Sequence, residues 1–147
     1  MDFDKIAEEL FLAMGAFQAG PIQRVQELSQ GEMAILGYLI LSDDEVTPTD
    51  LSRRLQLSSA RIANALNSME NKKYVVRTHD SVDRRKVYVA ITELGAEKAN
   101  HAKNQAIAGL KELLQELGEE DSLEFLRIMQ KVAYLIRKSE NGNTVKK

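Results

Sequence analysis

The stretch from Leu51 to Ile91 decides the fold: LSRRLQLSSARIANALNSMENKKYVVRTHDSVDRRKVYVAI. It follows Thr47–Asp50 (TPTD), which supplies a threonine N-cap, a proline at the first helical position and an acid in the first turn. This start predicts a short helix, because Ser58 is already placed as the N-cap of the next helix. Two short helices joined by a tight turn are typical of a helix-turn-helix.

The second of these helices, predicted over 59–72, has two faces of different character. At about 100° per residue, one face is apolar (Ile62, Ala65, Leu66 and Met69), and the opposite face is small or amide-bearing (Ala60, Asn64, Asn67 and Asn71, with Arg61, Ala63 and Ser68 beside them). A merely solvated helix more often carries Glu and Lys on its outer face. Asn can contact adenine, and Arg can contact guanine, through two hydrogen bonds. The pattern therefore favours contact with base edges in a DNA major groove over an ordinary solvated face.

Two β-rich runs follow, Tyr74–His79 and Lys86–Ile91, with a polar loop between them. They predict a hairpin with Arg84 and Arg85 near its tip. Arginine on a hairpin beside such a helix suits the narrow minor groove, where the potential is most negative. The alternative is local pairing of an arginine with Asp83, and the two roles are compatible in neighbouring arginines.

The rest of the chain predicts a helical framework. A first amphipathic helix covers Asp4–Ala19 and ends at Gly20–Pro21. A second, buried helix starts near Ser29, whose spacing to Glu32 is that of a capping box. Thr92 caps a long helix to about Leu117, and a last helix covers Glu119–Lys138. Residues 139–147 lack periodicity and predict a flexible tail. The fold class is mainly α, with a small β-hairpin wing.

Composition and charge narrow the function. The 147 residues suit one domain, contain no cysteine, and include no apolar run of membrane-spanning length; we therefore expect a cytoplasmic protein without a membrane partner. The net charge is −2, but residues 51–90 hold nine basic and three acidic residues, a net of +6, against −8 for the rest. This segregation indicates that the central segment binds a polyanion, although chance clustering is an alternative.

These observations give a set of candidate DNA contacts. For base contacts we predict Ser59, Arg61, Asn64 and Asn67, and for the DNA backbone Arg53, Arg54 and Lys86. Arg54 has the alternative of a solvated helix residue. Arg84 and Arg85 are predicted to reach the minor groove, with Asp83 supporting the wing.

The chain resembles the MarR family of bacterial transcription regulators. The resemblance is carried by Leu51–Leu55, Leu57–Ser58, Leu66, Met69–Glu70, Tyr74–Arg77, Asp83–Arg85, Ile91–Thr92 and Gly95. It implies a single domain with a DNA-binding lobe (29–92) and a helical dimerisation lobe (4–20 and 93–138). It also implies a homodimer on a pseudo-palindromic operator, acting as a repressor that a small aromatic or lipophilic effector releases.

Two positions depart from that family. Glycine commonly stands where this chain has Lys73, and lysine in a left-handed conformation would cost roughly 1 kcal/mol; an earlier helix end at Asn71 is the alternative. An acid often stands at the position of Asn67, paired with the arginine equivalent to Arg85. With Asn67 at this position, that ion pair is missing. Either Asp83 or Glu70 pairs with Arg85 in its place, or Arg85 is freer to contact DNA.

Other chemistry finds little support. His79 and His101 are the only histidines, so we expect no metal site and no cofactor. No phosphate-binding loop or nucleophile motif occurs, which argues against an enzyme. The remaining rivals are a winged-helix protein-interaction module and a DNA-binding protein insensitive to ligands.

Overall fold

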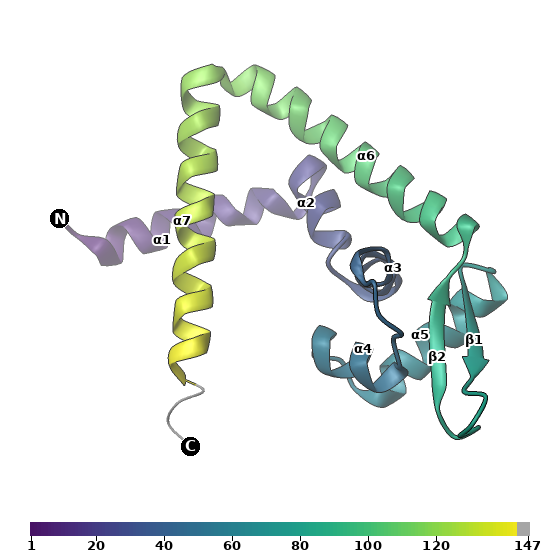
Figure 1. Ribbon diagram of the computed structural model, residues 1–147. Helices are drawn as coiled ribbons and strands as arrows, with labels where there is room; N and C mark the ends of the chain where they lie inside the picture. Colours follow the sequence, from purple (N-terminus) through teal and green to yellow (C-terminus); the bar gives the residue numbers. More distant parts are fainter. Residues whose placement is uncertain (144–147) are drawn as a thin grey trace. The chain divides into compact units, whose positions relative to one another are not determined.

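The computed structural model describes the backbone of residues 1–143 and the side chains of residues 1–140. The chain divides into two compact units, residues 1–108 and 109–147. The elements in order are α1 (Phe3–Met14), a 3-10 turn η1 (Gly15–Gln18), α2 (Gly20–Glu27), α3 (Gly31–Leu41), α4 (Pro48–Leu55), α5 (Ser59–Asn71), β1 (Val75–His79), β2 (Val87–Ile91), α6 (Glu93–Leu117) and α7 (Glu119–Asn143) (Figure 1). The fold class predicted from the sequence is confirmed.

The core lies among α3, α4, α5 and the hairpin. Its fully buried side chains come from each of these elements: Ile35, Leu36, Leu51, Ile62, Leu66, Met69 and Val75. β1 and β2 pair antiparallel, with Val75 opposite Ile91 and His79 opposite Val87. Val46 adds an isolated bridge to Val89, whose amide donates to the Val46 carbonyl oxygen at 2.7 Å. The hairpin is thereby fixed to the segment that precedes α4.

The helix-turn-helix forms at the predicted residues. The Thr47 side chain accepts from the Asp50 amide, and the Asp50 carboxylate accepts in return from the Thr47 amide at 2.9 Å. α4 ends at Leu55, and the residue that caps it, Gln56, is left-handed with φ 53°. The Ser52 hydroxyl then closes the turn by donating to the Leu57 carbonyl oxygen at 2.6 Å. Ser58 caps α5, as predicted, by accepting from the Arg61 amide.

Three predicted boundaries were wrong. The first helix, predicted to extend to Ala19, ends at Met14 and is followed by η1. Gly20–Pro21 begins α2, because proline is well suited to the first turn of a helix. α3 begins at Gly31 with Gln30 as its N-cap, so Ser29 and Glu32 form no capping box. The last helix continues through the predicted tail to Asn143, since an exposed helix needs no apolar periodicity. Residues 144–147 of that tail lie outside the described residues.

The start of α6 is packed directly onto the end of the helix-turn-helix. Thr92 caps α6 by accepting from the Gly95 amide at 3.0 Å, and its hydroxyl donates to the Lys73 carbonyl oxygen at 2.6 Å. A Cβ at Gly95 would lie 2.1 Å from the Tyr74 carbonyl oxygen. Glycine is therefore required at residue 95 by the close approach of α6 to the chain before β1.

Candidate nucleic-acid interface

The outward face of α5 is the centre of the candidate site. Ile62, Leu66 and Met69 are buried, as predicted, whereas the side chains of the opposite face are exposed (Ala60, Asn64, Asn67 and Asn71). Ser59 and Arg61 lie in the exposed first turn. α5 thus presents short polar side chains along one side, which allows a nucleic-acid groove to approach its backbone closely.

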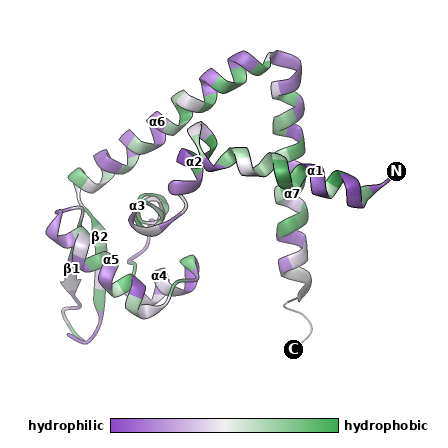
Figure 2. Cartoon of the chain, turned by 180° about the vertical axis from the view of Figure 1, so that it is seen from behind, coloured by the Kyte–Doolittle hydropathy of each residue, from purple (hydrophilic) through white to green (hydrophobic). Residues whose placement is uncertain are grey.

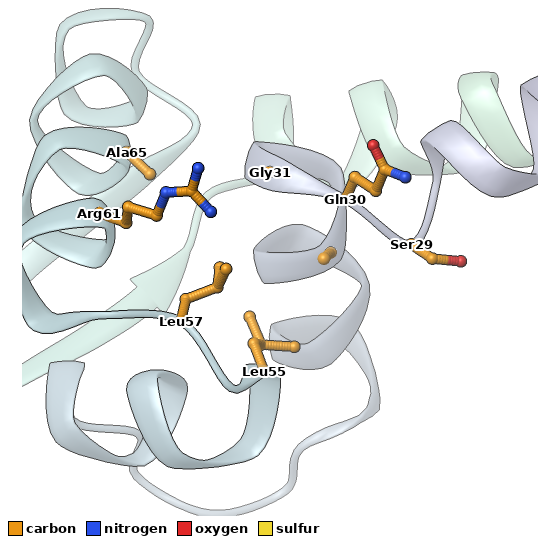
Figure 3. A pocket seen from close by; sticks show the side chains of 8 residues that line it. Ser29, Gln30, Gly31, Leu55, Leu57, Arg61 and Ala65 are labelled. Carbon is orange, nitrogen blue, oxygen red and sulfur yellow. The ribbon is translucent and has the colours of Figure 1, made fainter.

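Arg61 lies beside a pocket at one end of this face. The pocket encloses about 440 Å³ and is bounded by α5, the α4–α5 turn and the start of α3. Figure 3 shows the Arg61 side chain extending from α5 into the space in front of Gly31, with Leu55 and Leu57 below it.

A three-residue polar cluster connects α5 to the first wing strand. The Arg77 guanidinium donates through Nε to Glu70 Oε2 at 2.9 Å, through Nη2 to the same oxygen, and through Nη2 to Asn67 Oδ1. The hydrogen bond from Arg77 holds the pKa of Glu70 below its usual range, and the carboxylate raises the pKa of Arg77. The helix–wing ion pair is therefore present, formed by Glu70 and Arg77.

Sequence reasoning missed this role of Arg77. Ten residues separate Arg77 from Asn67, and no periodicity connects a strand residue to a helix residue. The family comparison pointed to Arg85 as the partner across the wing, but Arg85 pairs within the loop. Its Nε lies 3.3 Å from Asp83 Oδ1, and its side chain is 93% exposed. Asp83 Oδ1 also accepts from the Arg85 amide at 3.1 Å.

Asp80, which was not predicted as a site residue, organises the wing loop. Its Oδ1 accepts from the amides of Val82 and Asp83 at 2.8 and 2.9 Å, and its Oδ2 accepts from the Tyr88 hydroxyl at 3.1 Å. These hydrogen bonds, led by that from the Asp83 amide, lower the pKa of Asp80. An aspartate at the start of a hairpin loop is the signal that could have revealed it.

The other cations predicted to contact DNA lie in α4 and in the wing loop. Arg53 and Arg54 lie in the last turn of α4, and Arg53 Nη2 is 3.8 Å from Asp50 Oδ1. Arg84 and Lys86 lie in the exposed wing loop. His79 Nδ1 lies 2.9 Å from the Arg84 carbonyl oxygen. Because a carbonyl oxygen only accepts, the imidazole donates this hydrogen bond, which holds the loop backbone at Arg84.

Within the described residues, no group of three or more His, Asp or Glu side chains is placed to hold a metal ion. No helix of the described chain has the length and apolar character needed to cross a bilayer.

A helix-turn-helix followed by a hairpin packed against it defines a winged helix-turn-helix protein. Residues 26–86 match the model of the MarR family. The resemblance predicted from the sequence is confirmed.

Two curated proteins that are similar to part of this chain are described as transcriptional regulators. It is 28% identical over 94 residues to the uncharacterized HTH-type transcriptional regulator YdgJ of Bacillus subtilis, covering 64% of this chain and 57% of the relative. It is 29% identical over 86 residues to the transcriptional regulator AdcR of Streptococcus pyogenes, covering 56% and 58%. The chain thus matches less than two thirds of the length of either curated relative.

Solved structures extend the likeness in fold. The YusO protein of Bacillus subtilis has a TM-score of 0.73 at 19% identity, over 91% of this chain and 99% of that protein. FabT of Streptococcus pneumoniae, solved in complex with DNA, has a TM-score of 0.66 at 21% identity, over 93% and 99%. The shared fold therefore includes the helices on both sides of the winged helix.

Proposed function

We propose that this protein is a sequence-specific regulator of transcription that binds double-stranded DNA and is not an enzyme. The observation that carries the proposal is the exposed row of amide and small side chains on α5, next to a wing with exposed arginines. The printed descriptions of YdgJ and AdcR as transcriptional regulators, and of FabT as a complex with DNA, support it.

In this function α5 enters the major groove and the wing, residues 80–86, enters the minor groove. Ser59, Arg61, Asn64 and Asn67 contact base edges. Arg53, Arg54 and Lys86 neutralise phosphates, because they are exposed cations in α4 and in the wing loop. Arg84 and Arg85 supply positive charge to the narrow groove, and Asp83 positions Arg85 through the contact described above.

The test is a titration of promoter duplexes at several salt concentrations. Affinity should fall steeply with salt, because neutralised phosphates release counterions. Arg84→Ala with Arg85→Ala should weaken binding and reduce the log–log salt slope by about 2 for each protomer bound. Arg24→Ala with Lys131→Ala removes the same charge from α2 and α7 and should change neither quantity. Binding indifferent to salt, or unaffected by loss of the wing arginines, contradicts the proposal and favours a protein-interaction module.

The functional unit in this proposal is a homodimer on a pseudo-palindromic operator. α1 has no buried residue, and Phe3, Phe11 and Leu12 are each more than 70% exposed. Figure 2 shows apolar residues recurring along α1 and α7. Among the described side chains of α7, residues 119–140, none is buried within the chain. A second copy of the chain would cover the exposed apolar residues of each of these helices and present two copies of α5 to successive turns of the duplex.

The proposed regulation is repression released by a small aromatic or lipophilic effector. A cavity of about 250 Å³ supports this part, with walls from the α2–α3 junction, α3 and α6 (Leu28, Met33, Gly37, Ile40, Leu41, Ala99, Asn100 and Lys103). Gly37 has open space where a Cβ would stand. Gly37→Leu should therefore fill the cavity, leave DNA affinity unchanged, and abolish release by compounds found in an aromatic and lipophilic screen. Release that persists in this variant places the effector elsewhere, and release by no compound favours a ligand-insensitive protein.

A further inference from the structure

The amide of Asn67 has a fixed orientation on the outer face of α5. Arg77 Nη2 reaches it from β1 at 2.5 Å. A guanidinium only donates hydrogen bonds, so the atom that faces it must be the amide oxygen, Oδ1. The amide nitrogen, with its two hydrogens, is left as the free end of the side chain.

Arg77 is itself held in place while it makes this contact. Its Nε and Nη2 both donate to Glu70 Oε2, one turn along α5 from Asn67. The two hydrogens of Nη2 are thereby divided between Glu70 and Asn67. The side chain of Arg77 is 29% exposed and that of Glu70 is 34% exposed, so the cluster lies at the edge of the surface that α5 presents.

This arrangement changes what Asn67 can recognise. An asparagine that contacts adenine with two hydrogen bonds uses its oxygen for the N6 amino group and its nitrogen for N7. Here the oxygen is engaged, and the positive charge beside it disfavours an approaching amino group. Guanine presents two acceptors, O6 and N7, and no amino group in the major groove.

We infer that Arg77 determines the base preference of Asn67, making its amide a donor that favours guanine over adenine at the base pair it meets. Arg77 acts as a positioning residue and needs no contact with DNA itself. This inference rests on the proposed function, since it concerns how the α5 surface distinguishes DNA sequences.

The experiment selects binding sites from a randomised duplex library with the 147-residue chain and with variants of it. Asn67→Ala identifies the base pair that Asn67 meets, because the preference there should disappear. In the wild type that position should favour guanine over adenine by about tenfold. Arg77→Met frees the amide oxygen and should move the preference to adenine. Glu70→Gln keeps Arg77 and should retain the preference for guanine. Arg24→Met is the control for the loss of one positive charge.

The double variant Asn67→Ala with Arg77→Met separates positioning from a general loss of structure. In the Asn67→Ala background, Arg77→Met should have no further effect on the preference at that position. A structural effect would instead lower affinity for all sequences alike. Arg77→Lys, which keeps the charge, serves as a second variant if Arg77→Met fails to fold. It should weaken the preference for guanine, because an ammonium lacks the rigid planar fork that holds the guanidinium on both partners.

The outcomes distinguish this inference from the proposed function. Salt-dependent, sequence-specific binding by the wild type with an unchanged preference in Arg77→Met overturns the inference and leaves the proposed function intact. A wild type that prefers adenine at the Asn67 position also overturns it. Failure of the wild type to select any sequence overturns both.

Discussion

Gly95 shows most directly how one residue sets the relation between the wing and α6. The Cβ of an alanine would lie 2.1 Å from the Tyr74 carbonyl oxygen, which already accepts from the Thr92 amide at 3.0 Å. Neither backbone can move without breaking the cap of α6. Gly95→Ala should therefore lower the free energy of unfolding by about 1–3 kcal/mol in urea denaturation.

The matched control for Gly95 is another helical glycine, Gly37. A Cβ there meets nothing within 4 Å, so Gly37→Ala should leave stability unchanged or raise it by about 0.5–1 kcal/mol. Equal effects of the two substitutions would contradict a cost that is specific to the close approach of residue 95 to Tyr74.

Lys73, like Gln56, is a non-glycine residue with a left-handed backbone conformation. α5 ends at Asn71, and Lys73 adopts φ 62°, the left-handed conformation expected at the family's glycine position. Lys73→Gly should therefore raise the free energy of unfolding by about 1 kcal/mol. The control is Lys72→Gly, since Lys72 is right-handed with φ −80° and its Nζ pairs with Glu32 Oε2 at 2.8 Å. That variant should be destabilised, and a loss of stability in both would contradict the strain at Lys73.

At the scale of the element, the wing loop depends on the ionised form of Asp80. Its pKa is lowered in the folded protein by the Asp83 and Val82 amides and the Tyr88 hydroxyl. The stabilisation is therefore present at pH values above the ordinary pKa of an aspartate and is lost as pH falls through the lowered value. Asp80→Ala should be less stable than the wild type at pH 7, and the difference should shrink toward pH 3.

Urea midpoints measured across this pH range test the role of Asp80. Ser81→Ala, an exposed change in the same loop, provides the control and should show no pH-dependent difference. A difference between Asp80→Ala and the wild type that stays constant down to pH 3 would mean that the carboxylate charge is not what orders the loop.

The elements differ in how far their sequences predict them. α4 and α5 were predicted closely because Thr47, Asp50 and Ser58 determine the helix starts through local hydrogen bonds. α2 was missed because a Gly–Pro pair fits a helix end as well as a helix start. The starting point of α3 was wrong because the Ser29–Glu32 spacing is also compatible with a turn.

The candidate site was only partly predictable for a related reason. The exposed face of α5 follows from helical periodicity, which one sequence displays. The contacts of Arg77 with Glu70 and Asn67 depend on the packing of β1 against α5, and no local pattern encodes it. The pairing of Arg85 with Asp83, two residues away, was among the alternatives because it is local.

At the scale of the whole molecule, the exposed apolar residues of α7 are expected to form the interface of the proposed homodimer, which binds two half-sites at once. Leu126 and Met129 lie one turn apart on α7 and are 52% and 50% exposed. In the proposed homodimer, Leu126→Glu with Met129→Glu would bury charge at the interface and should yield a monomer in sedimentation velocity. Lys131→Glu lies on the opposite side of α7 and should remain dimeric.

Loss of the dimer should weaken DNA binding, because only a dimer can bind both half-sites of one operator together. A dimer binds both half-sites with the affinity gain of an intramolecular second step, whereas a monomer binds each alone. The Leu126→Glu, Met129→Glu variant should therefore lose at least about 100-fold in affinity for the full palindrome while keeping the single half-site affinity of the wild type. Insertion of 5 base pairs between half-sites, about half a turn, should weaken the wild type and leave the variant unaffected. A monomeric wild type, or a variant equally sensitive to the insertion, would contradict assembly through this surface.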